Sequence, residues 1–218
     1  MDITFIGHSC FQIRGKECTL VVDPYDPKHV GYNLPKLNAD AVLVTHHHPD
    51  HDNAAGVYNT RIVIDGPGEY EVNGVTILGY KTFHDTKNGA ERGDNTIFLI
   101  DVEGLNILHL GDLGHDLPDE VLSELPGIDV LLIPVGGNYT IDAQTASKVI
   151  SSIEPNFVVP MHYATPDLKF EKDLEPLEKF LDEMGVENGS KKGQDKLTLS
   201  SKSGNLEETE VIVLSPKH

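Results

Sequence analysis

The sequence predicts an α/β protein of the α+β kind, folded as a single domain over residues 1–218. Short apolar runs bounded by polar or turn residues recur along the chain, as expected for buried β-strands. Helical patterns are fewer, and they enter later, between strands. The chain shows neither an internal repeat nor a linker that would divide it, and its length is sufficient for one large core.

The strand-like runs come first as hairpins and later alternate with helices. Strands are expected at residues 3–6, 10–13, 19–22, 41–44, 61–64, 75–79, 96–100, 106–110, 130–135 and 157–159, with closing strands at 196–200 and 207–214.

Three helices are expected, at residues 119–125, 142–153 and 170–184. The last carries one apolar stripe, formed by Leu174, Leu177, Phe180 and Leu181. A further helix is expected to begin at Asp52 or Asn53, either of which suits an N-cap. The polar segment 187–194 is expected to be a solvated loop.

The two cysteines, Cys10 and Cys18, are predicted to be reduced. Residues 10–14 and 17–22 are typical of a β-hairpin with the two-residue turn Gly15-Lys16, in which Ile13 faces Cys18. Cys10 then lies on the opposite face, out of reach of a disulfide. Buried thiols are typical of a reducing compartment, and the N-terminus shows no export signal, so we expect a cytoplasmic protein.

The charge balance is strongly acidic, with 17 Lys and Arg against 35 Asp and Glu and a net charge of -18. Phosphate binding depends on clustered basic residues, so nucleic acid and anionic membranes are disfavoured as partners. A nuclease stays open as an alternative, because two divalent cations at one site would reverse the local field. No apolar run approaches the roughly 20 residues that span a bilayer, and a homo-oligomer is left open.

The segment 45–52 reads Thr-His-His-His-Pro-Asp-His-Asp and follows an expected buried strand. Imidazole and carboxylate are ligands that suit zinc and neighbouring divalent metals. Buried imidazoles without hydrogen-bond partners would be costly, so packing is a poor explanation for this density. The segment therefore predicts metal binding, with a histidine-rich surface loop as the alternative.

Three more strands each deliver a candidate ligand just past their last apolar residue. These residues are His84, Asp112 and His162. Loops at strand ends can aim several side chains at one point. Each residue alone would pass for an ordinary polar side chain, but together they predict a metal site at one edge of a sheet.

The order His-x-His-x-Asp-His, an isolated His, an Asp after Gly and a final His resembles the metallo-β-lactamase superfamily. The matching residues are His46, His48, Asp50, His51, His84, Asp112 and His162. The run Gly7-His8-Ser9-Cys10-Phe11, with segments 109–115, 134–137 and 160–163, also resembles the subgroup of L-ascorbate-6-phosphate lactonase-like proteins.

The resemblance implies a four-layer αβ/βα sandwich, with two mixed sheets packed face to face, helices outside and a dinuclear site at one edge. It implies a first metal held by His46, His48 and His84, and a second by Asp50, His51 and His162, with Asp112 bridging. Zinc is the expected metal, and manganese or nickel are alternatives because imidazole is unselective.

The function expected from these features is that of a metal-dependent hydrolase acting on a lactone, ester or phosphodiester. Two cations about 3.5–4 Å apart can share a hydroxide that attacks carbon or phosphorus, while Asp50 takes up the proton. Tyr163, next to His162, is predicted to be an oxyanion donor. A metal-binding protein with little turnover, for example a nickel protein, is the alternative, and its metals would lack an open position.

Several other histidines and carboxylates receive different expectations. A structural role for His8 is weighed equally against a catalytic or extra-ligand role. His109 is expected to point to the other face of its strand unless Gly111 forms a bulge. His115 could lean over the site from its loop. His47 is expected to face solvent or to support a ligand, and Asp85 and Asp116 are expected to be surface carboxylates.

Two loops offer candidate contacts to an anionic substrate. Arg92 could bind a phosphate or carboxylate through its guanidinium, but a surface ion pair is the preferred interpretation. Residues 136–140 could cradle an anion with their backbone N–H groups. A tight turn followed by a helix cap at Thr140 or Asp142 is preferred for that segment.

Overall fold

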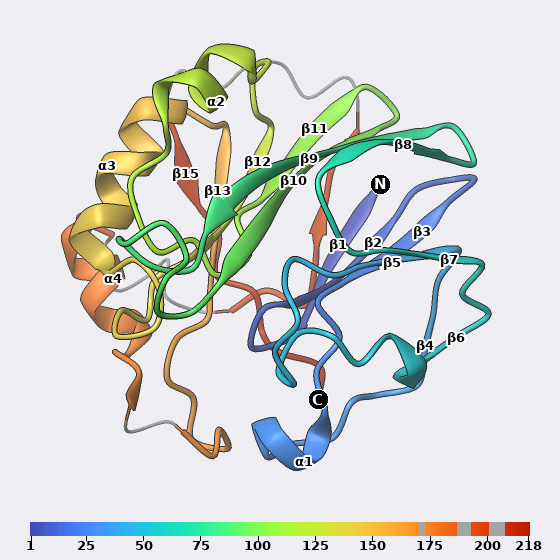
Figure 1. Cartoon of the computed structure of the whole chain (residues 1–218), viewed down its shortest axis with the longest axis horizontal. Coiled ribbons are helices and arrows are strands. Elements are labelled where there is room, and N and C mark those ends of the chain that lie inside the picture. The colour runs from blue at the N-terminus through green and yellow to red at the C-terminus, as the bar shows by residue number, and fades with distance from the viewer. Residues whose placement is uncertain (171–172, 187–192, 201–207) are drawn as a thin grey trace.

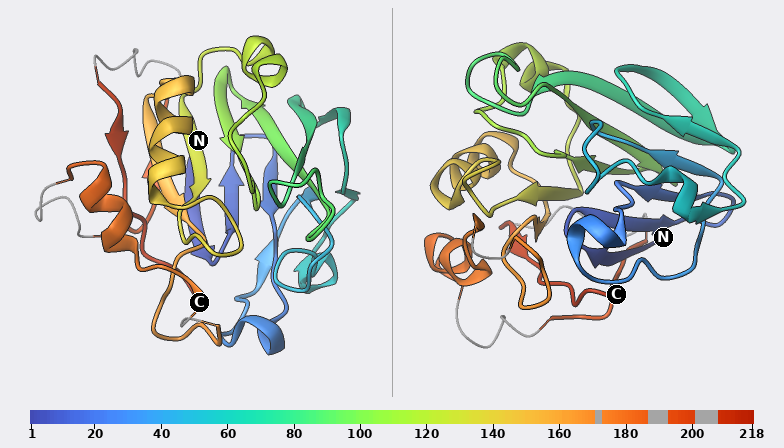
Figure 2. Two further views of the ribbon diagram at one scale, coloured as in Figure 1. Left: turned by 60° about the vertical axis from the view of Figure 1, so that its left-hand side comes forward. Right: turned by 60° about the horizontal axis from the view of Figure 1, so that its bottom comes forward.

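The structure is a computed structural model that describes residues 1–170, 173–186, 193–200 and 208–218. Two β-sheets pack face to face, and the longer helices lie against the outer side of the larger sheet (Figure 1, Figure 2). This arrangement confirms the predicted fold class. The helices in the described ranges include none that is long and apolar enough to cross a membrane.

The smaller of the two packed sheets is built mainly from the N-terminal quarter of the chain. Its strands, in spatial order, are β14 (Leu197–Thr198), β1 (Asp2–Gly7), β2 (Cys10–Arg14), β3 (Thr19–Val22), β5 (Ala41–Leu43) and β7 (Ile62–Ile64). Strand β2 is antiparallel to both β1 and β3, and β5 is parallel to β3. Strands β1, β3 and β5 therefore end at the same edge.

The larger sheet combines an antiparallel half with a parallel half. Its spatial order is β15 (Glu210–Val211), β13 (Phe157–Met161), β12 (Val130–Pro134), β11 (Leu105–His109), β10 (Asp94–Val102), β9 (Val75–Phe83) and β8 (Gly68–Val72). Both β9 and β11 are antiparallel to β10, and β12 and β13 run parallel to β11. Strands β9, β11 and β13 therefore also share a direction. A separate pair is formed by β4 (Leu37–Asn38) and β6 (Val57–Tyr58).

The helices are short apart from α3 (Ala143–Ile153), which packs on β12 and on α4 (Leu177–Glu183). Helix α3 begins after Asp142, whose Oδ1 accepts the Thr145 N–H at 2.8 Å, so the cap predicted at this position is confirmed. The remaining helices are α1 (Pro27–Val30), α2 (Asp119–Glu124) and a 3₁₀ turn, Ala54–Gly56.

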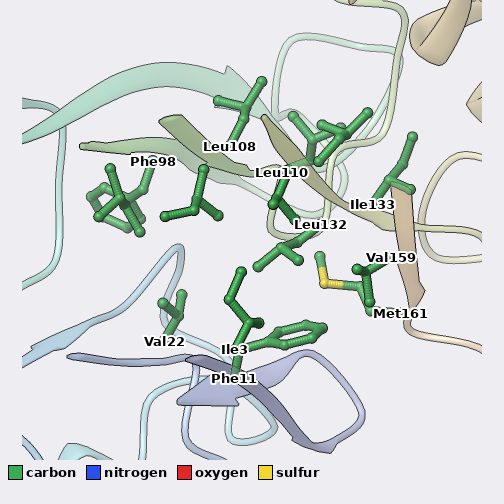
Figure 3. Packing of buried hydrophobic residues seen from close by; sticks show 14 of the residues in the cluster. Ile3, Phe11, Val22, Phe98, Leu108, Leu110, Leu132, Ile133, Val159 and Met161 are labelled. Carbon is green, nitrogen blue, oxygen red and sulfur yellow. The ribbon is translucent and has the colours of Figure 1, made fainter. Parts of the chain in front are cut away.

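The smaller sheet is buried on both faces, because its side chains alternate between two apolar clusters. Phe11 and Val22 point into the cluster between the sheets, whereas Cys10 and Val21 belong to a cluster on the outer face. Figure 3 shows Ile3, Phe11 and Val22 opposite side chains of the larger sheet. Each fully buried side chain of this size contributes roughly 1.5–3 kcal/mol.

The predicted two-residue turn between β2 and β3 is wrong. The Gly15 N–H donates to the Cys18 carbonyl at 2.9 Å, and Ile13 pairs with Leu20, so residues 15–18 form the connection. This register places Ile13 and Leu20 together in the cluster between the sheets. Cys18 packs in that cluster and Cys10 in the outer one, so both thiols are free and buried, as predicted.

Two predicted helices differ from those observed. Residues 170–184 do not form one helix, since α4 begins only after Pro176, which has no N–H to continue an earlier turn. Leu174 packs in the cluster on the outer face of the smaller sheet, whereas Phe180 belongs to the cluster around the larger sheet, so the apolar residues do not share one face. The helix expected after Asp52 is only the 3₁₀ turn at 54–56. The expected loop at 187–194 lies largely outside the described residues.

Candidate metal centre

The candidate ligands gather where the shared strand directions bring strand ends together. His8 follows β1, Asp23 follows β3, and the segment 45–52 lies just beyond β5. From the larger sheet, His84 follows β9, Asp112 lies three residues past β11, and His162 follows β13. The structure thus brings together all seven residues of the predicted ligand set, and His8 joins them.

The two sheets are joined at the site by the backbone of two histidines. His8 and His162 both adopt left-handed conformations, with φ of 57° and 54°. The His162 N–H donates to the His8 carbonyl at 2.9 Å. A left-handed residue other than glycine costs about 1–2 kcal/mol. These two turns therefore hold strain at the point where both imidazoles enter the cluster.

The Asp23 carboxylate holds the histidine-rich loop 45–52 in place through hydrogen bonds. Its Oδ1 accepts the Thr45 N–H at 2.8 Å, and its Oδ2 accepts the Thr45 hydroxyl at 2.7 Å. The same Oδ2 lies 2.9 Å from His51 Nδ1. Asp23 is fully buried, so this hydrogen bond fixes the orientation of His51 and turns its Nε2 toward the cluster.

Asp112 lies at the centre of the cluster, surrounded by imidazoles. Its Oδ2 is 3.1 Å from His84 Nε2, 3.2 Å from His162 Nε2, 3.3 Å from His51 Nε2 and 3.7 Å from His46 Nε2. One carboxylate oxygen has two lone pairs and cannot accept hydrogen bonds from four rings. A divalent cation coordinated by the rings and the carboxylate would resolve this crowding.

Unpartnered buried atoms show that the cluster fits metal ions. In the described part of the chain, His46 Nε2, His51 Nε2 and Asp112 Oδ1 are buried without a hydrogen-bond partner. Leaving such groups unsatisfied costs about 1–3 kcal/mol each. His51 donates its Nδ1 proton to Asp23, so in the neutral ring Nε2 presents a lone pair to the cluster, as a metal ligand requires.

The ligand atoms divide into groups within 4.8 Å of one another. One group consists of His46, His48 and His84, and another of His8, Asp50, His51 and His162. His46 and His51 also group with Asp112, which links the two. The first two groups match the two metal sites implied by the resemblance, apart from the addition of His8.

His8 approaches the cluster through Asp50. Its Nε2 lies 3.2 Å from Asp50 Oδ2, and its ring centroid is 4.3 Å from that of His162. Burial lowers the pKa of His8 to about 4, with His162 adding to the effect and Asp50 opposing it. His8 is therefore neutral near pH 7, and its Nε2–H can donate to the Asp50 carboxylate.

Burial and the charges of the cluster shift the pKa values of its histidines in different directions. Burial lowers the pKa of His46 well below its usual value, so its ring is neutral and can act as a ligand. Burial also acts to lower the pKa of His51, but Asp112, Asp50 and Asp23 together raise it well above the usual value, so a cation bound at Nε2 would have to displace a proton. Burial opposes ionisation of Asp50, yet His51 and His8 lower its pKa, so this carboxyl is ionised at neutral pH.

Close packing of the backbone at Gly111 fixes the position of Asp112. Gly111 has φ of 55°, and a Cβ there would lie 2.4 Å from Asn95 Oδ1 and 2.7 Å from Thr45 Cβ. Asn95 Oδ1 accepts the Asp112 N–H at 3.0 Å, while its amide donates to the Leu110 carbonyl and the Thr82 hydroxyl. Sequence reasoning missed Asn95 and Asp23. Asp23 could have been found by the rule that found the candidate ligands, because it directly follows a strand.

The remaining histidines lie outside the cluster. His47 is exposed, as expected for a residue facing solvent. His109 is fully buried and does not reach the metal cluster: its Nδ1 accepts the Gly111 N–H, and its Nε2 lies 3.1 Å from the Ser9 carbonyl. His115 Nε2 accepts the Phe83 N–H at 3.1 Å, so His115 does not lean over the site.

The expectation that Asp85 is a surface carboxylate is wrong. Asp85 is buried, and its oxygens accept the backbone N–H groups of Lys87, Gly89, Glu91 and Arg92. Burial acts to raise its pKa, but these four hydrogen bonds prevail and hold the pKa at about 2. Asp85 therefore shapes the loop that follows His84. Asp116 is exposed, as predicted.

The structure does not bring Tyr163 to the cluster. Tyr163 packs in the core between the sheets, with its ring centroid 6.3 Å from that of Phe5. Burial raises its pKa to about 12. Residues 136–140 form the tight turn preferred from the sequence, since the N–H groups of Gly137, Tyr139 and Thr140 donate within the segment 137–141.

A cavity of about 420 Å³ opens over the cluster. His48, Asp50, His84 and His162 form part of its lining, so the candidate ligands are accessible from solvent. Arg92, Tyr139 and Phe170 also line it, together with His29, Pro49 and Asp112. In the described residues no carboxylate lies within 4.0 Å of the Arg92 guanidinium, so the preferred ion pair is wrong. Arg92 stacks instead on the Tyr139 ring, 4.5 Å from its centroid.

Residues 2–162 match a family model described as a β-lactamase superfamily domain. The chain belongs to the metallo-β-lactamase superfamily. It is 31% identical over 193 residues to a UPF0173 metal-dependent hydrolase of Pyrococcus abyssi, covering 76% of this chain and 85% of that protein. A UPF0173 protein of Thermoplasma acidophilum is 32% identical over 193 residues, covering 77% and 85%. The chain therefore belongs to this family of metal-dependent hydrolases.

Solved structures agree with this placement. A Thermotoga maritima protein, named as a candidate zinc-dependent hydrolase of the superfamily, is 36% identical with a TM-score of 0.76, covering 98% of this chain and 97% of that one. A metallo hydrolase from Ignicoccus hospitalis, 22% identical with a TM-score of 0.65, covers 99% and 95% and shows the fold alone. The predicted superfamily and enzyme class are confirmed. The resemblance to L-ascorbate-6-phosphate lactonase-like proteins stays a prediction.

Proposed function

We propose that this metal-dependent hydrolase uses two divalent cations at the described cluster. The first is held by His46, His48 and His84, and the second by Asp50, His51 and His162, with Asp112 shared between them. The crowding of four imidazoles around Asp112 Oδ2 is the observation that carries this proposal. Zinc is the proposed metal, supported by the name of the Thermotoga maritima relative, and manganese or nickel are alternatives.

Two cations bound there would lower the pKa of a coordinated water toward about 7 and polarise the group under attack. The protein's side chains would hold the cations and orient the ligands. Asp50 lines the cavity and stays ionised, so it can act as a ligand and as a proton acceptor. His8 donates to Asp50 Oδ2 and acts as a positioning residue, while Asp23 fixes His51.

The cavity suits a small molecule with an ester, lactone or phosphodiester bond. Its volume of about 420 Å³ and the aromatic side chains of Tyr139 and Phe170 are typical of small-ligand pockets. Arg92 is the sole Lys or Arg in the described lining, and the chain carries a net charge of -18. A nucleic acid substrate is therefore not favoured.

We also propose that residues 1–218 form one domain and that the protein is cytoplasmic. The first point is supported by the apolar cluster that both sheets share. The second is supported by two buried, free thiols, which are typical of a reducing compartment.

A metal-binding protein with little turnover is the second candidate function. His8 lies in one group with Asp50, His51 and His162, so it could fill the position that catalysis needs to keep open. An exchangeable water on each metal would exclude this candidate.

The test is to prepare zinc, manganese and nickel forms and to assay them on ester, lactone and phosphodiester substrates, with Asp50→Ala as control. We expect turnover of at least one class that falls by about 100-fold or more in Asp50→Ala, in line with typical losses of a proton-transfer group. Turnover that survives Asp50→Ala would place the reaction elsewhere. Metal binding without turnover by any form would favour the second candidate.

A further inference from the structure

We propose that Arg92 is an anion-binding residue of the cavity, and that the substrate carries a carboxylate or phosphate group apart from the bond that is hydrolysed. This inference rests on the proposed function, because it places the scissile bond at the metal cluster. Three features of Arg92 carry it: a fixed backbone, a fixed side chain and a charge without a counterion.

Hydrogen bonds of the loop next to His84 fix the backbone of Arg92. The Arg92 N–H donates to Asp85 Oδ2 at 2.8 Å, and Asp85 directly follows His84. The next residue, Gly93, accepts the His84 N–H through its carbonyl at 3.1 Å. Arg92 is therefore held on both sides beside a candidate metal ligand. The buried Asp85 carboxylate, with four backbone donors, is the anchor of this loop.

The side chain of Arg92 is fixed by a second loop. Its guanidinium lies over the Tyr139 ring, 4.5 Å from the centroid. Tyr139 belongs to the tight turn after β12, and the neighbouring Asn138 amide donates to the Asp173 carbonyl at 2.9 Å. Stacking occupies one face of the guanidinium and leaves its N–H edge available for a planar oxyanion. Ordering this flexible side chain in advance reduces the entropy lost on binding.

The charge of Arg92 has no carboxylate counterion in the described part of the chain. Other cations such as Arg14 and Lys36 also lack a carboxylate within 4.0 Å in the described residues, but of these three Arg92 alone lines the cavity. Asp50 and Asp112 line the same cavity, but both belong to the ligand cluster. A cation that is positioned, unpaired and set in the wall of the cavity is suited to an anionic group of the substrate.

The aromatic part of the wall limits what else the substrate can carry. Phe170 lies edge-on to His8, with ring centroids 5.3 Å apart, and 6.0 Å from the ring of His29. An apolar or planar body packed against Phe170 and Tyr139 is therefore compatible with this cavity. The proposed substrate has a hydrolysable bond at the metals, a compact body and an oxyanion at Arg92.

Binding of hydroxamates to the metal-loaded protein tests this inference without requiring turnover. Acetohydroxamate chelates a cation but carries no second anion. The monohydroxamates of malonic, succinic and glutaric acid add a carboxylate at increasing reach, and their phosphonate analogues add a phosphate-like group. We expect at least one anionic compound to bind about tenfold more tightly than acetohydroxamate, as measured by calorimetry. The better of the two series identifies the preferred oxyanion.

The variants are Arg92→Gln and Arg92→Lys, with Arg61→Gln as a control that removes one exposed positive charge elsewhere. In Arg92→Gln the advantage of the anionic compounds should fall to within about twofold, while acetohydroxamate binding is unchanged. Arg92→Lys should keep part of the advantage, and Arg61→Gln all of it. Thermal melts check that each variant is folded.

The outcomes separate the inference from the function on which it rests. If anionic compounds gain nothing over acetohydroxamate, or if Arg92→Gln weakens all hydroxamates equally, Arg92 is a structural residue and the inference is wrong. If acetohydroxamate does not bind to any metal-loaded form, the metal centre itself is wrong, and both proposals fail.

Discussion

At the scale of single residues, the geometry of the site depends on the side chains that orient the candidate ligands as much as on the candidate ligands themselves. Asp23 reaches both Thr45 and His51, and Asn95 places Asp112 through its backbone. Such partners fix the tautomer and orientation of a metal-binding imidazole. Their loss should therefore change metal binding more than it changes the fold.

Asp23→Asn should weaken binding of the more loosely held metal by roughly 10–100-fold, because His51 loses its carboxylate partner. Metal affinity is measured by competition with a chromogenic chelator. Asp116→Asn, which alters an exposed carboxylate, is the matched control. An unchanged affinity in Asp23→Asn would mean that His51 is not a ligand oriented by Asp23.

Asp85 provides a pH-dependent contribution to stability. Its pKa in the folded protein is about 2, below the usual 3.8, so its stabilising effect is complete above about pH 4 and is lost as the pH falls toward 2. The difference in unfolding free energy between the metal-free native protein and Asp85→Asn should be largest near neutrality and shrink below pH 4. Urea titrations between pH 2 and pH 7 measure it. A difference independent of pH would contradict the hydrogen bonding assigned to Asp85.

At the scale of elements, the chain places its functional groups at strand ends that share one direction. Gly111 is the tightest point of this arrangement, because β11, the Thr45 loop and Asn95 meet there. A side chain at that position would force the sheets apart at the site.

Gly111→Ala should destabilise the protein by about 2–3 kcal/mol through the left-handed backbone and the close contacts. Gly104→Ala is the control, since Gly104 has φ of 79° but no atom within 4 Å of a Cβ. Gly104→Ala should lower the free energy of unfolding by about 1 kcal/mol, which is the cost of the left-handed backbone alone. If urea unfolding shows the same loss of unfolding free energy in both metal-free variants, Asn95 and Thr45 move aside to accommodate the added methyl group.

The sequence predicted the strands near the site well, because buried strands appear as apolar runs that end in polar residues. The same rule located His84, Asp112 and His162. It could not show that Asp85 turns inward, since the four N–H groups that bind it belong to a loop without periodicity. Tyr163 was misplaced because the left-handed turn at His162 changes the direction of the following side chain. Strand β8 was missed because its residues are mostly polar or exposed.

At the scale of the whole molecule, the two sheets meet at a cluster of buried imidazoles and carboxylates. Without cations this cluster holds unpartnered polar atoms, which oppose folding. Metal binding and stability should therefore be coupled. At free metal about 100-fold above the dissociation constant, the gain for one site is about 2.7 kcal/mol.

Removal of metal by a chelator should lower the melting temperature, and added zinc should restore it in proportion to the logarithm of its free concentration. Differential scanning calorimetry measures the melting temperature of the native protein and of Asp112→Asn with and without zinc. In Asp112→Asn, added zinc should raise the melting temperature much less. A melting temperature that does not respond to metal in the native protein would mean that the cluster binds no cation of useful affinity.

Anomalous X-ray diffraction from crystals of the zinc-loaded protein, recorded at the zinc edge, tests the central claim most directly. Two peaks are expected on either side of Asp112, one beside His46, His48 and His84 and the other beside Asp50, His51 and His162. A single peak, a peak away from Asp112, or no peak in a protein that still hydrolyses its substrate would contradict the shared centre.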